Sequence, residues 1–156
     1  MTDYDEVFAA RPQWTVALAA LPKPEVFALA GRLAETHTVR PLAVSQAGLA
    51  LLPLRESVQK QTFYLGELPL STSHLEIETP DGTTVQGAAL IMADDADFAD
   101  ALALCDGVLT HRLSGWEDVA GQVAEGLERL RHQARIRKTM LTRSRVNFSL
   151  LNEDDE

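Results

Sequence analysis

The chain has 156 residues, of which 46% are apolar, 24% charged and 6% aromatic, and this composition fits one globular domain and excludes disorder over most of the length. Its single cysteine excludes an internal disulfide and a multi-cysteine zinc site, which fits a reducing compartment, so we expect a cytoplasmic protein. The first eight residues include three acidic ones and no basic run, and no stretch approaches about 18 apolar residues, so we expect neither a signal peptide nor a membrane span.

The formal net charge of −9 is unevenly distributed. Residues 1–128 hold 7 Lys and Arg against 19 Asp and Glu, residues 129–152 hold 7 Lys and Arg with no acid, and the last four residues are all acidic. Nucleic-acid binding requires a broad positive surface that displaces counterions from phosphates. The acidic body therefore argues against nucleic-acid binding, and the basic stretch is the one exception.

Two helices are predicted over residues 5–36. Apolar residues at helical spacing indicate a first helix that Pro22 ends, with Pro12 either near its start or marking a break. A second helix is expected over about residues 24–36. Four of its residues are expected to face the core: Val26, Phe27, Ala30 and Leu33. We expect the two helices to form a helical hairpin.

An antiparallel sheet of about four strands is predicted over residues 39–92. Turn residues divide this region at Ala47-Gly48, at Gly66-Glu67 and, most clearly, at Pro80-Asp81-Gly82, where Gly82 supplies a positive φ. Between the turns, short apolar or alternating runs are typical of strands. The strand segments are expected over residues 39–45, 49–54, 62–65, 70–78 and 83–92.

Two further helices are predicted within residues 95–141. Asp94 or Asp95 is expected to cap the first of them, which Ser114-Gly115 ends. Its expected buried stripe, at helical spacing, is Phe98, Leu102, Cys105 and Leu109. The long final helix starts at Trp116 and carries Val119, Val123, Leu127 and Leu130 on one face.

The order of these elements predicts an α+β fold in a single domain over residues 1–156. It consists of the N-terminal helical hairpin, the antiparallel sheet, two C-terminal helices, and an extended C-terminal arm with an acidic tail over residues 142–156. Because strands and helices do not alternate along the chain, a doubly wound Rossmann fold is not expected.

Catalytic patterns are mostly absent from the sequence. No two histidines lie four residues apart on one helix, so we expect surface or capping roles for His37, His74, His111 and His132. Ser73 and His74 are neighbours in a strand and point to opposite faces, which excludes a nucleophile and base pair.

Other candidate sites also have simpler interpretations. The acidic cluster Asp94, Asp95, Asp97 and Asp100 lacks the glycine and the closing glutamate of a calcium loop, so we expect it to cap a helix and complement its dipole. The nine glycines are scattered and form no phosphate-binding loop, so the chain alone is not expected to bind ATP. Cys105 lies in an apolar stripe and is expected to be a buried, inert thiol.

The basic segment over residues 129–145 carries more information. It is either a solvated helix end, where cations complement the helix dipole, or a docking element for an acidic partner surface or a phosphate-bearing ligand. Docking is favoured because three cations lie at helical spacing and an apolar tail follows them. The expected partner-binding residues are Arg131, Arg135, Lys138, Arg145, Val146 and Phe148.

Four short motifs follow one another over about residues 8–150. They are Arg11-Pro12-Gln13-Trp14, Ala47-Gly48-Leu49, Phe63-Tyr64-Leu65-Gly66-Glu67 and Ser144-Arg145-Val146-Asn147-Phe148. Their combination and order resemble the PhnG family, a subunit of the carbon-phosphorus lyase machinery. The chain departs from the usual family pattern at Met92-Ala93, Asn147 and Ser149.

The resemblance implies a cytoplasmic complex with PhnH-, PhnI- and PhnJ-like subunits and with PhnL- and PhnK-like ATPases. It implies support for a transfer in which methylphosphonate displaces adenine from the ribose C1 of ATP, with the chemistry assigned to the PhnI-like subunit. ATP and methylphosphonate are then substrates of the complex, and no cofactor is expected to bind this chain alone. No nucleic acid and no membrane is expected as a partner, and the chain's own role would be assembly.

Two alternatives stay open. The chain could be a stand-alone nucleic-acid or anion-binding module that uses the basic C-terminal helix, in which case affinity would fall steeply with salt. It could also be an enzyme whose scattered His and Asp residues meet on folding, in which case the isolated chain would be active.

Overall fold

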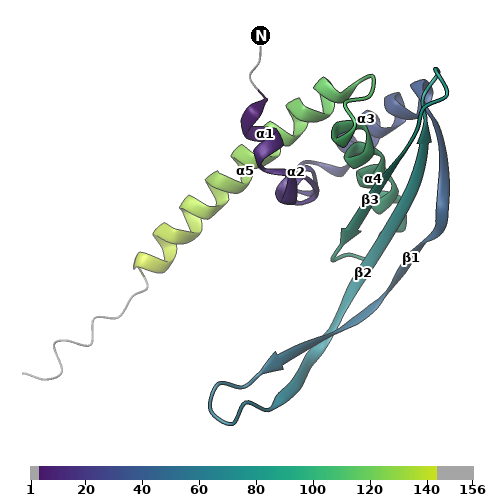
Figure 1. Ribbon diagram of the computed structural model, residues 1–156. Coiled ribbons are helices and arrows are strands. Elements are labelled where there is room, and N and C mark those ends of the chain that lie inside the picture. Colours follow the sequence, from purple (N-terminus) through teal and green to yellow (C-terminus); the bar gives the residue numbers. More distant parts are fainter. Residues whose placement is uncertain (1–3, 144–156) are drawn as a thin grey trace, which may run out of the picture.

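The computed structural model describes residues 4–143 and has an α+β fold, as predicted (Figure 1). Over these residues, short N-terminal helices precede the strands, and two longer helices follow them. The elements in chain order are α1 (Asp5–Ala9), the 3-10 turn η1 (Arg11–Gln13), α2 (Trp14–Ala19), α3 (Lys23–Thr36), β1 (Thr38–Arg55), β2 (Thr62–Glu78), β3 (Thr84–Ile91), α4 (Ala96–Thr110) and α5 (Trp116–Arg143).

Within residues 4–143 the sheet has three antiparallel strands in the order β1-β2-β3, where about four were expected. The turns predicted at Ala47-Gly48 and Gly66-Glu67 are wrong, because Gly48 pairs with Leu70 and Gly66 pairs with Leu52 inside the ladder. Neither glycine has a positive φ. Both are extended residues, so each pair of short predicted strands is one long strand.

The true turn of the β1–β2 hairpin lies in the polar stretch between the two strands. The Glu56 carboxylate accepts hydrogen bonds from the backbone N–H of Val58 at 2.8 Å and of Gln59 at 2.6 Å. The N–H of Glu56 donates to the carbonyl of Gln61 at 2.9 Å, and Lys60 has a φ of 59°. A side chain that accepts local N–H groups in this way stabilises a turn without glycine.

The predicted turn at Pro80-Asp81-Gly82 forms and joins β2 to β3. Gly82 has a φ of 84°, and the Asp81 carboxylate accepts the N–H of Thr83 at 3.0 Å. Hydrogen bonds from the Thr79 hydroxyl, and then from Thr83, hold the pKa of Asp81 below its ordinary value. The paired residues of β2 and β3 run from Glu78 to Ser71, where β3 ends.

The register of β1 shifts where the strand leaves the core. Pro41 pairs with Leu75, but Ala43 pairs with His74 and Gln46 with Thr72, so β1 holds extra residues here. Such bulges bend a strand and increase its twist.

Helix α4 lies against β2 and β3 and forms the centre of the core. Its predicted stripe is buried: Phe98, Leu102, Cys105 and Leu109 are all at most 3% exposed. A Cβ on Gly87 of β3 would clash with the carbonyl oxygen of Ala103, and one on Gly107 would clash with the Ile77 side chain. The helix backbone therefore contacts the strand backbone directly.

The N-terminal helices pack on the C-terminal ones, not chiefly on each other as the predicted helical hairpin required. Helix α2 packs against α5, and α3 packs against α4. The first predicted helix is interrupted at η1, which contains Pro12, so this proline marks a break. A Cβ on Gly126 of α5 would clash with the carbonyl oxygen of Ala17, so α2 and α5 also meet backbone to backbone.

The inward face of α3 differs from the prediction at one residue. Val26, Ala30 and Leu33 are buried as expected, and Leu29 is buried with them. Phe27 is 40% exposed and lies at the margin, with its ring centroid 5.6 Å from that of Phe98. The stripe of four residues already fills the face, which leaves Phe27 about 110° around the helix from its centre.

The Arg-x-x-Trp motif at the start of the chain holds the N-terminal helices together. Trp14 is 3% exposed, and its indole N–H donates to the carbonyl of Val7 at 2.6 Å. The Phe8 and Trp14 rings meet edge to face, and the guanidinium of Arg11 lies 5.8 Å from the Trp14 ring centroid. This motif therefore has a structural role.

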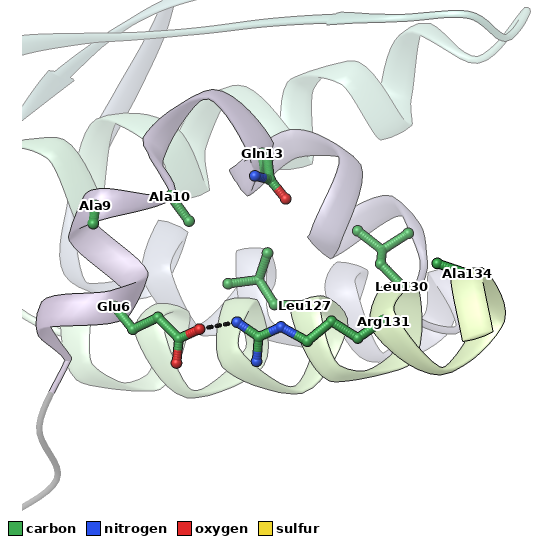
Figure 2. Close-up of a pocket in the computed structure, with 8 residues that line it drawn as sticks. All are labelled: Glu6, Ala9, Ala10, Gln13, Leu127, Leu130, Arg131 and Ala134. Atoms are coloured by element: carbon green, nitrogen blue, oxygen red, sulfur yellow. Dashed lines mark hydrogen bonds and ion pairs between the residues drawn. The ribbon is translucent and has the colours of Figure 1, made fainter. Parts of the chain in front are cut away.

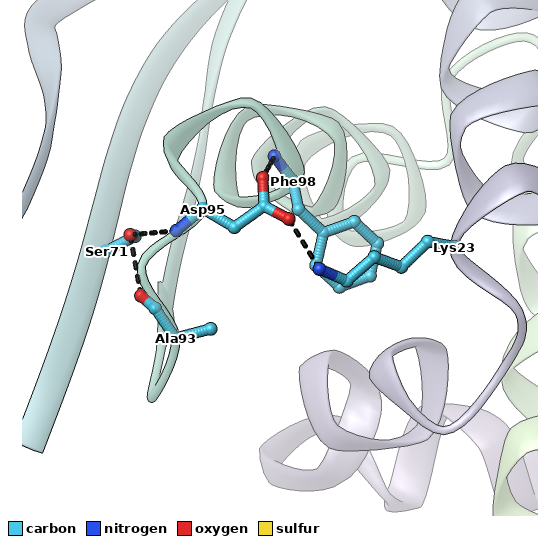
Figure 3. A network of polar contacts seen from close by, with 5 residues as sticks. All are labelled: Lys23, Ser71, Ala93, Asp95 and Phe98. Carbon is cyan, nitrogen blue, oxygen red and sulfur yellow. Dashed lines mark hydrogen bonds and ion pairs between the residues drawn. The ribbon is translucent and has the colours of Figure 1, made fainter.

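A polar network fixes the first turn of α4 (Figure 3). Asp95 is the cap, and its Oδ1 accepts the N–H of Phe98 at 3.0 Å while its Oδ2 accepts Lys23 Nζ of α3 at 2.5 Å. Ser71 of β2 donates its hydroxyl to the carbonyl of Ala93 at 2.7 Å and accepts the N–H of Asp95 at 2.9 Å. The network ties α3 and β2 to the start of α4.

Two alanine substitutions in α5 test the contact with α2. Gly126→Ala is expected to lower the free energy of unfolding by about 2 to 3 kcal/mol, because the new methyl group would overlap the Ala17 carbonyl. Gly121→Ala has open space and is expected to raise it by about 0.5 to 1 kcal/mol through helix propensity. Urea denaturation measures both, and equal effects of the two changes would contradict the close contact.

The Asp95 network generates a pH-dependent prediction. Asp95→Ala is expected to cost about 1 kcal/mol through loss of the cap, whereas Asp95→Asn retains an acceptor and loses the charge that pairs with Lys23. The Lys23 hydrogen bond, and then the Phe98 N–H, lower the pKa of Asp95 below 3.8.

A carboxyl group with a lowered folded-state pKa stabilises the fold above its unfolded-state pKa, and this contribution is lost as the pH falls through the folded value. The stability difference between the wild type and Asp95→Asn should therefore be constant near neutral pH and shrink below about pH 4. Chemical denaturation between pH 7 and pH 2 measures it, and a difference that grows on acidification would be contrary to this account.

Candidate protein interface

The part of the chain that the structure describes assembles no metal-binding group of three or more His, Cys, Asp or Glu residues. Ser73 and His74 point to opposite faces of β2, as predicted. The Ser73 hydroxyl donates to Asp100 at 2.5 Å inside the protein, whereas the exposed His74 Nε2 lies 3.2 Å from Gln86 Oε1. They cannot act together as a nucleophile and base.

His37 differs from the other histidines because it is 4% exposed. It follows the last residue of α3, and its Nε2 lies 3.0 Å from the carbonyl oxygen of Ser114. This contact joins the end of α3 to the loop before α5, so His37 is a buried capping residue and not a surface one. His111 and His132 are exposed, as expected.

The acidic cluster has structural partners. Asp95 caps α4, and Asp97 lies in the first turn, where its charge complements the helix dipole. Asp100 accepts hydrogen bonds from the hydroxyls of Ser45 and Ser73, and so links α4 to β1 and β2.

The Cys105 thiol is inert at neutral pH. It is buried, and this burial, followed by the nearby charge of Asp106, raises its pKa to about 12. The thiolate, which is the reactive form, is therefore negligible near pH 7, as the apolar stripe predicted.

The C-terminal half of α5 extends beyond the body of the protein (Figure 1). We call residues 131–143 the basic arm. Every residue from 131 to 142 is exposed. A helical segment of about a dozen residues with so few tertiary contacts is marginal in water, because helix stability normally comes from tertiary packing. The arm therefore has the properties of an element that another molecule completes.

Three of the predicted partner-binding residues lie in the arm, and their electrostatic surroundings differ. Arg131 pairs with Glu128 at 2.5 Å and also with Glu6 of α1, so its charge is already matched within the chain. Arg135 and Lys138 are exposed and have no carboxylate partner among residues 4–143. Of the three predicted contacts, Arg135 and Lys138 are therefore the two whose charge is available to a partner.

A groove lies at the base of the arm, between α5 and the first helical turns (Figure 2). Its volume is about 460 Å³, and the Glu6–Arg131 pair closes one side. Its floor is apolar. The lining residues are Glu6, Ala9, Ala10, Gln13, Leu127, Leu130, Arg131 and Ala134.

Apolar side chains on the arm accompany its cations. Ile136 is 43% exposed, Met140 66% and Leu141 64%. Apolar groups beside unpaired cations are typical of protein interfaces, in which the apolar area supplies affinity and the charges supply specificity. Three other predicted contacts, Arg145, Val146 and Phe148, lie outside the described residues.

The predictions from sequence missed a second exposed apolar surface, on the far half of the β1–β2 hairpin. We call residues 47–70 the distal hairpin. Five of its large side chains are between 47% and 69% exposed: Leu49, Leu51, Phe63, Tyr64 and Leu65. A signal was present, because the run from residue 49 to residue 54 is apolar without alternation, which is typical of strands covered on both faces.

Two comparisons with known proteins bear on identity. Residues 9–152 match the family model described as phosphonate metabolism protein PhnG. A search of curated proteins gave no match. The family match spans both the distal hairpin and the basic arm. Separately, no helix in residues 4–143 has the length and apolar character that crossing a membrane requires.

Proposed function

The chain belongs to the PhnG family of phosphonate metabolism proteins, and we propose that it is a non-catalytic assembly subunit of a carbon-phosphorus lyase core complex. Its partners in this proposal are PhnH-, PhnI- and PhnJ-like subunits, with PhnL- and PhnK-like ATPases. The complex forms a bond from a phosphonate oxygen of methylphosphonate to the ribose C1 of ATP, while the bond from C1 to adenine breaks and adenine leaves.

The observation that carries the assembly role is the exposed basic arm, on a body whose described residues assemble no metal-binding cluster. The residues that chemistry would need are committed elsewhere: Asp95 and Asp100 hold α4, and His37 caps α3. Arg135 and Lys138, by contrast, have no carboxylate partner in the described chain. An unsupported helix with unmatched charge supports docking better than catalysis.

The arm indicates the chemistry of its partner surface. Two exposed cations, three residues apart on a helix, lie on one face and suit an acidic surface. The exposed Ile136 and Met140, four residues apart, form an apolar strip about 150° around the helix from these cations, so they lie on a different face. We therefore assign the face of the arm that carries Arg135 and Lys138 to an acidic surface on the PhnI-like subunit.

The assembly role predicts the activity of the purified chain. Alone, the chain should neither release adenine from ATP nor consume methylphosphonate, yet adenine release by the partner subunits should require it. Chromatographic detection of adenine, with and without each subunit, measures this. Adenine release by the isolated chain would contradict an assembly role and would favour the alternative of an enzyme.

Charge reversal on the arm tests the docking surface. Arg135→Glu with Lys138→Glu is expected to abolish co-purification with the PhnI-like subunit at about 0.15 M salt, because like charges facing each other at an interface cost several kcal/mol. The circular dichroism spectrum should stay that of the wild type, since exposed charges affect helix stability by at most about 1 kcal/mol.

Arg32→Glu, which reverses an exposed charge on α3, is the control and should leave co-purification intact. If the double variant still co-purifies as the wild type does, the arm is a solvated helix end and not a docking element.

A further inference from the structure

Among residues 4–143, nothing forms a covering layer over the distal hairpin, which is a two-stranded ribbon. Strand β3 ends at Ile91, opposite Ser71, so beyond this point only β1 and β2 pair. From residue 47 to residue 55 the ribbon extends about 26 Å at the usual rise of a strand. Figure 1 shows it projecting beyond the helices, separately from the basic arm.

The register places apolar side chains on both faces of this ribbon. Residues directly opposite each other share a face, and successive residues alternate between faces. Pro53 pairs with Tyr64, which puts Tyr64 on the face of Leu49 and Leu51. Leu54 pairs with Phe63, on the other face with Leu52. Five of these side chains are each at least 39% exposed: Leu49, Leu51, Leu54, Phe63 and Tyr64.

A ribbon of this kind is incomplete by itself. An isolated two-stranded hairpin is marginally stable in water, and it becomes stable when a third strand or an apolar layer packs against it. The distal hairpin exposes both edges and both faces at once. Something outside residues 4–143 must therefore supply the cover.

Prolines favour contact through the faces over contact along an edge. Pro53 in β1 and Pro69 in β2 have no N–H, and a strand tolerates proline where its N–H would point away from the ladder. A strand added along either edge would therefore lack a hydrogen bond at each proline. The exposed apolar side chains carry no such penalty.

Two properties of the distal hairpin, its two exposed apolar faces and its balanced charge, indicate what kind of partner surface covers it. A symmetric pair with a second copy would cover one face of each ribbon and leave the other face in water. The distal hairpin has no net charge, because it contains two cations and two anions: Arg55, Lys60, Glu56 and Glu67. An acidic partner surface of the kind that suits the arm would therefore not attract it. The fitting occupant is an apolar, weakly charged cleft with two walls.

We propose that the distal hairpin inserts into an apolar cleft of a different subunit of the complex and contacts it through both faces. This inference rests on the proposed function, because that subunit is one of the PhnH-, PhnI- or PhnJ-like partners. It adds a second docking surface that is separate from the basic arm. This surface is apolar and has no net charge, whereas the arm is cationic.

The experiment measures binding of the full chain to the co-expressed and purified PhnH-, PhnI- and PhnJ-like subunits. Leu51→Lys places a charge on one face of the ribbon and Phe63→Lys places one on the other. Each single change is expected to weaken binding at least tenfold without altering the circular dichroism spectrum, since both side chains are already exposed. Leu90→Lys, in an exposed position of β3, is the control and should bind normally.

The outcomes separate this inference from the proposed function. If the wild-type chain does not bind the partner subunits, the proposed function fails. If it binds and both hairpin variants bind equally well, the proposed function stands and the insertion is overturned. Loss of binding in only one variant would overturn the contact through both faces.

Two further measurements do not depend on how the variants fold. Backbone amides of residues 47–70 should exchange with solvent more slowly in the complex than in the free chain, and unchanged exchange would overturn the proposal. The isolated wild-type chain should sediment as a monomer. A dimer that either hairpin variant dissociates would overturn it in favour of a second copy as the occupant.

Discussion

The direct contact between α4 and β3 is the constraint on which the rest of the structure depends. Glycines at residues 87 and 107 bring the helix backbone onto the strand, and α2, α3 and α5 then close around the other sides of the helix. Helix α4 has 15 residues, or about 22 Å, whereas β1 and β2 have 18 and 17 residues and reach about 55 Å. One helix therefore covers less than half of the hairpin.

Helix α5 is likewise longer than the elements that pack against it. Its first half packs on α2, where the two backbones meet, and α1 reaches only as far as the start of its second half, so the rest of α5 projects alone among the described residues (Figure 1). A small core thus supports two projections that it cannot cover, one cationic and one apolar with balanced charge. Because the two surfaces differ in chemistry, they suit different surfaces of a surrounding assembly, as expected for a member of the PhnG family.

Local patterns in the sequence predicted most elements but not how far they extend. The cap at Asp95, the turn at Gly82 and the buried stripe around Cys105 each depend on neighbouring residues, and each is confirmed. The turns at Gly48 and Gly66 were wrong because glycine also fits an extended strand, and only the cross-strand partners decide between the two.

Of the two proposed docking surfaces, only the one on α5 was predicted from the sequence, for a similar physical reason. An excess of Arg and Lys is visible in the sequence itself, so Arg135 and Lys138 could be singled out. From the sequence alone, Leu51 and Tyr64 are expected to be buried in the core, and only the extent of the covering layer shows that they are exposed. Likewise, the match of Arg131 with Glu6 joins the two ends of the fold and could not be read from spacing.

The hydrogen bonds of Asp100 have a consequence for the direction in which the hairpin points. Ser45 lies at the bulge where β1 leaves the core, and its hydroxyl is held, together with that of Ser73, by this one carboxylate on α4. The ribbon beyond Ser45 behaves as a lever about 33 Å long, so a change of about 10° at the bulge would move its tip by about 6 Å. A partly buried carboxylate at the edge of the core thus sets the direction of a surface far away from it.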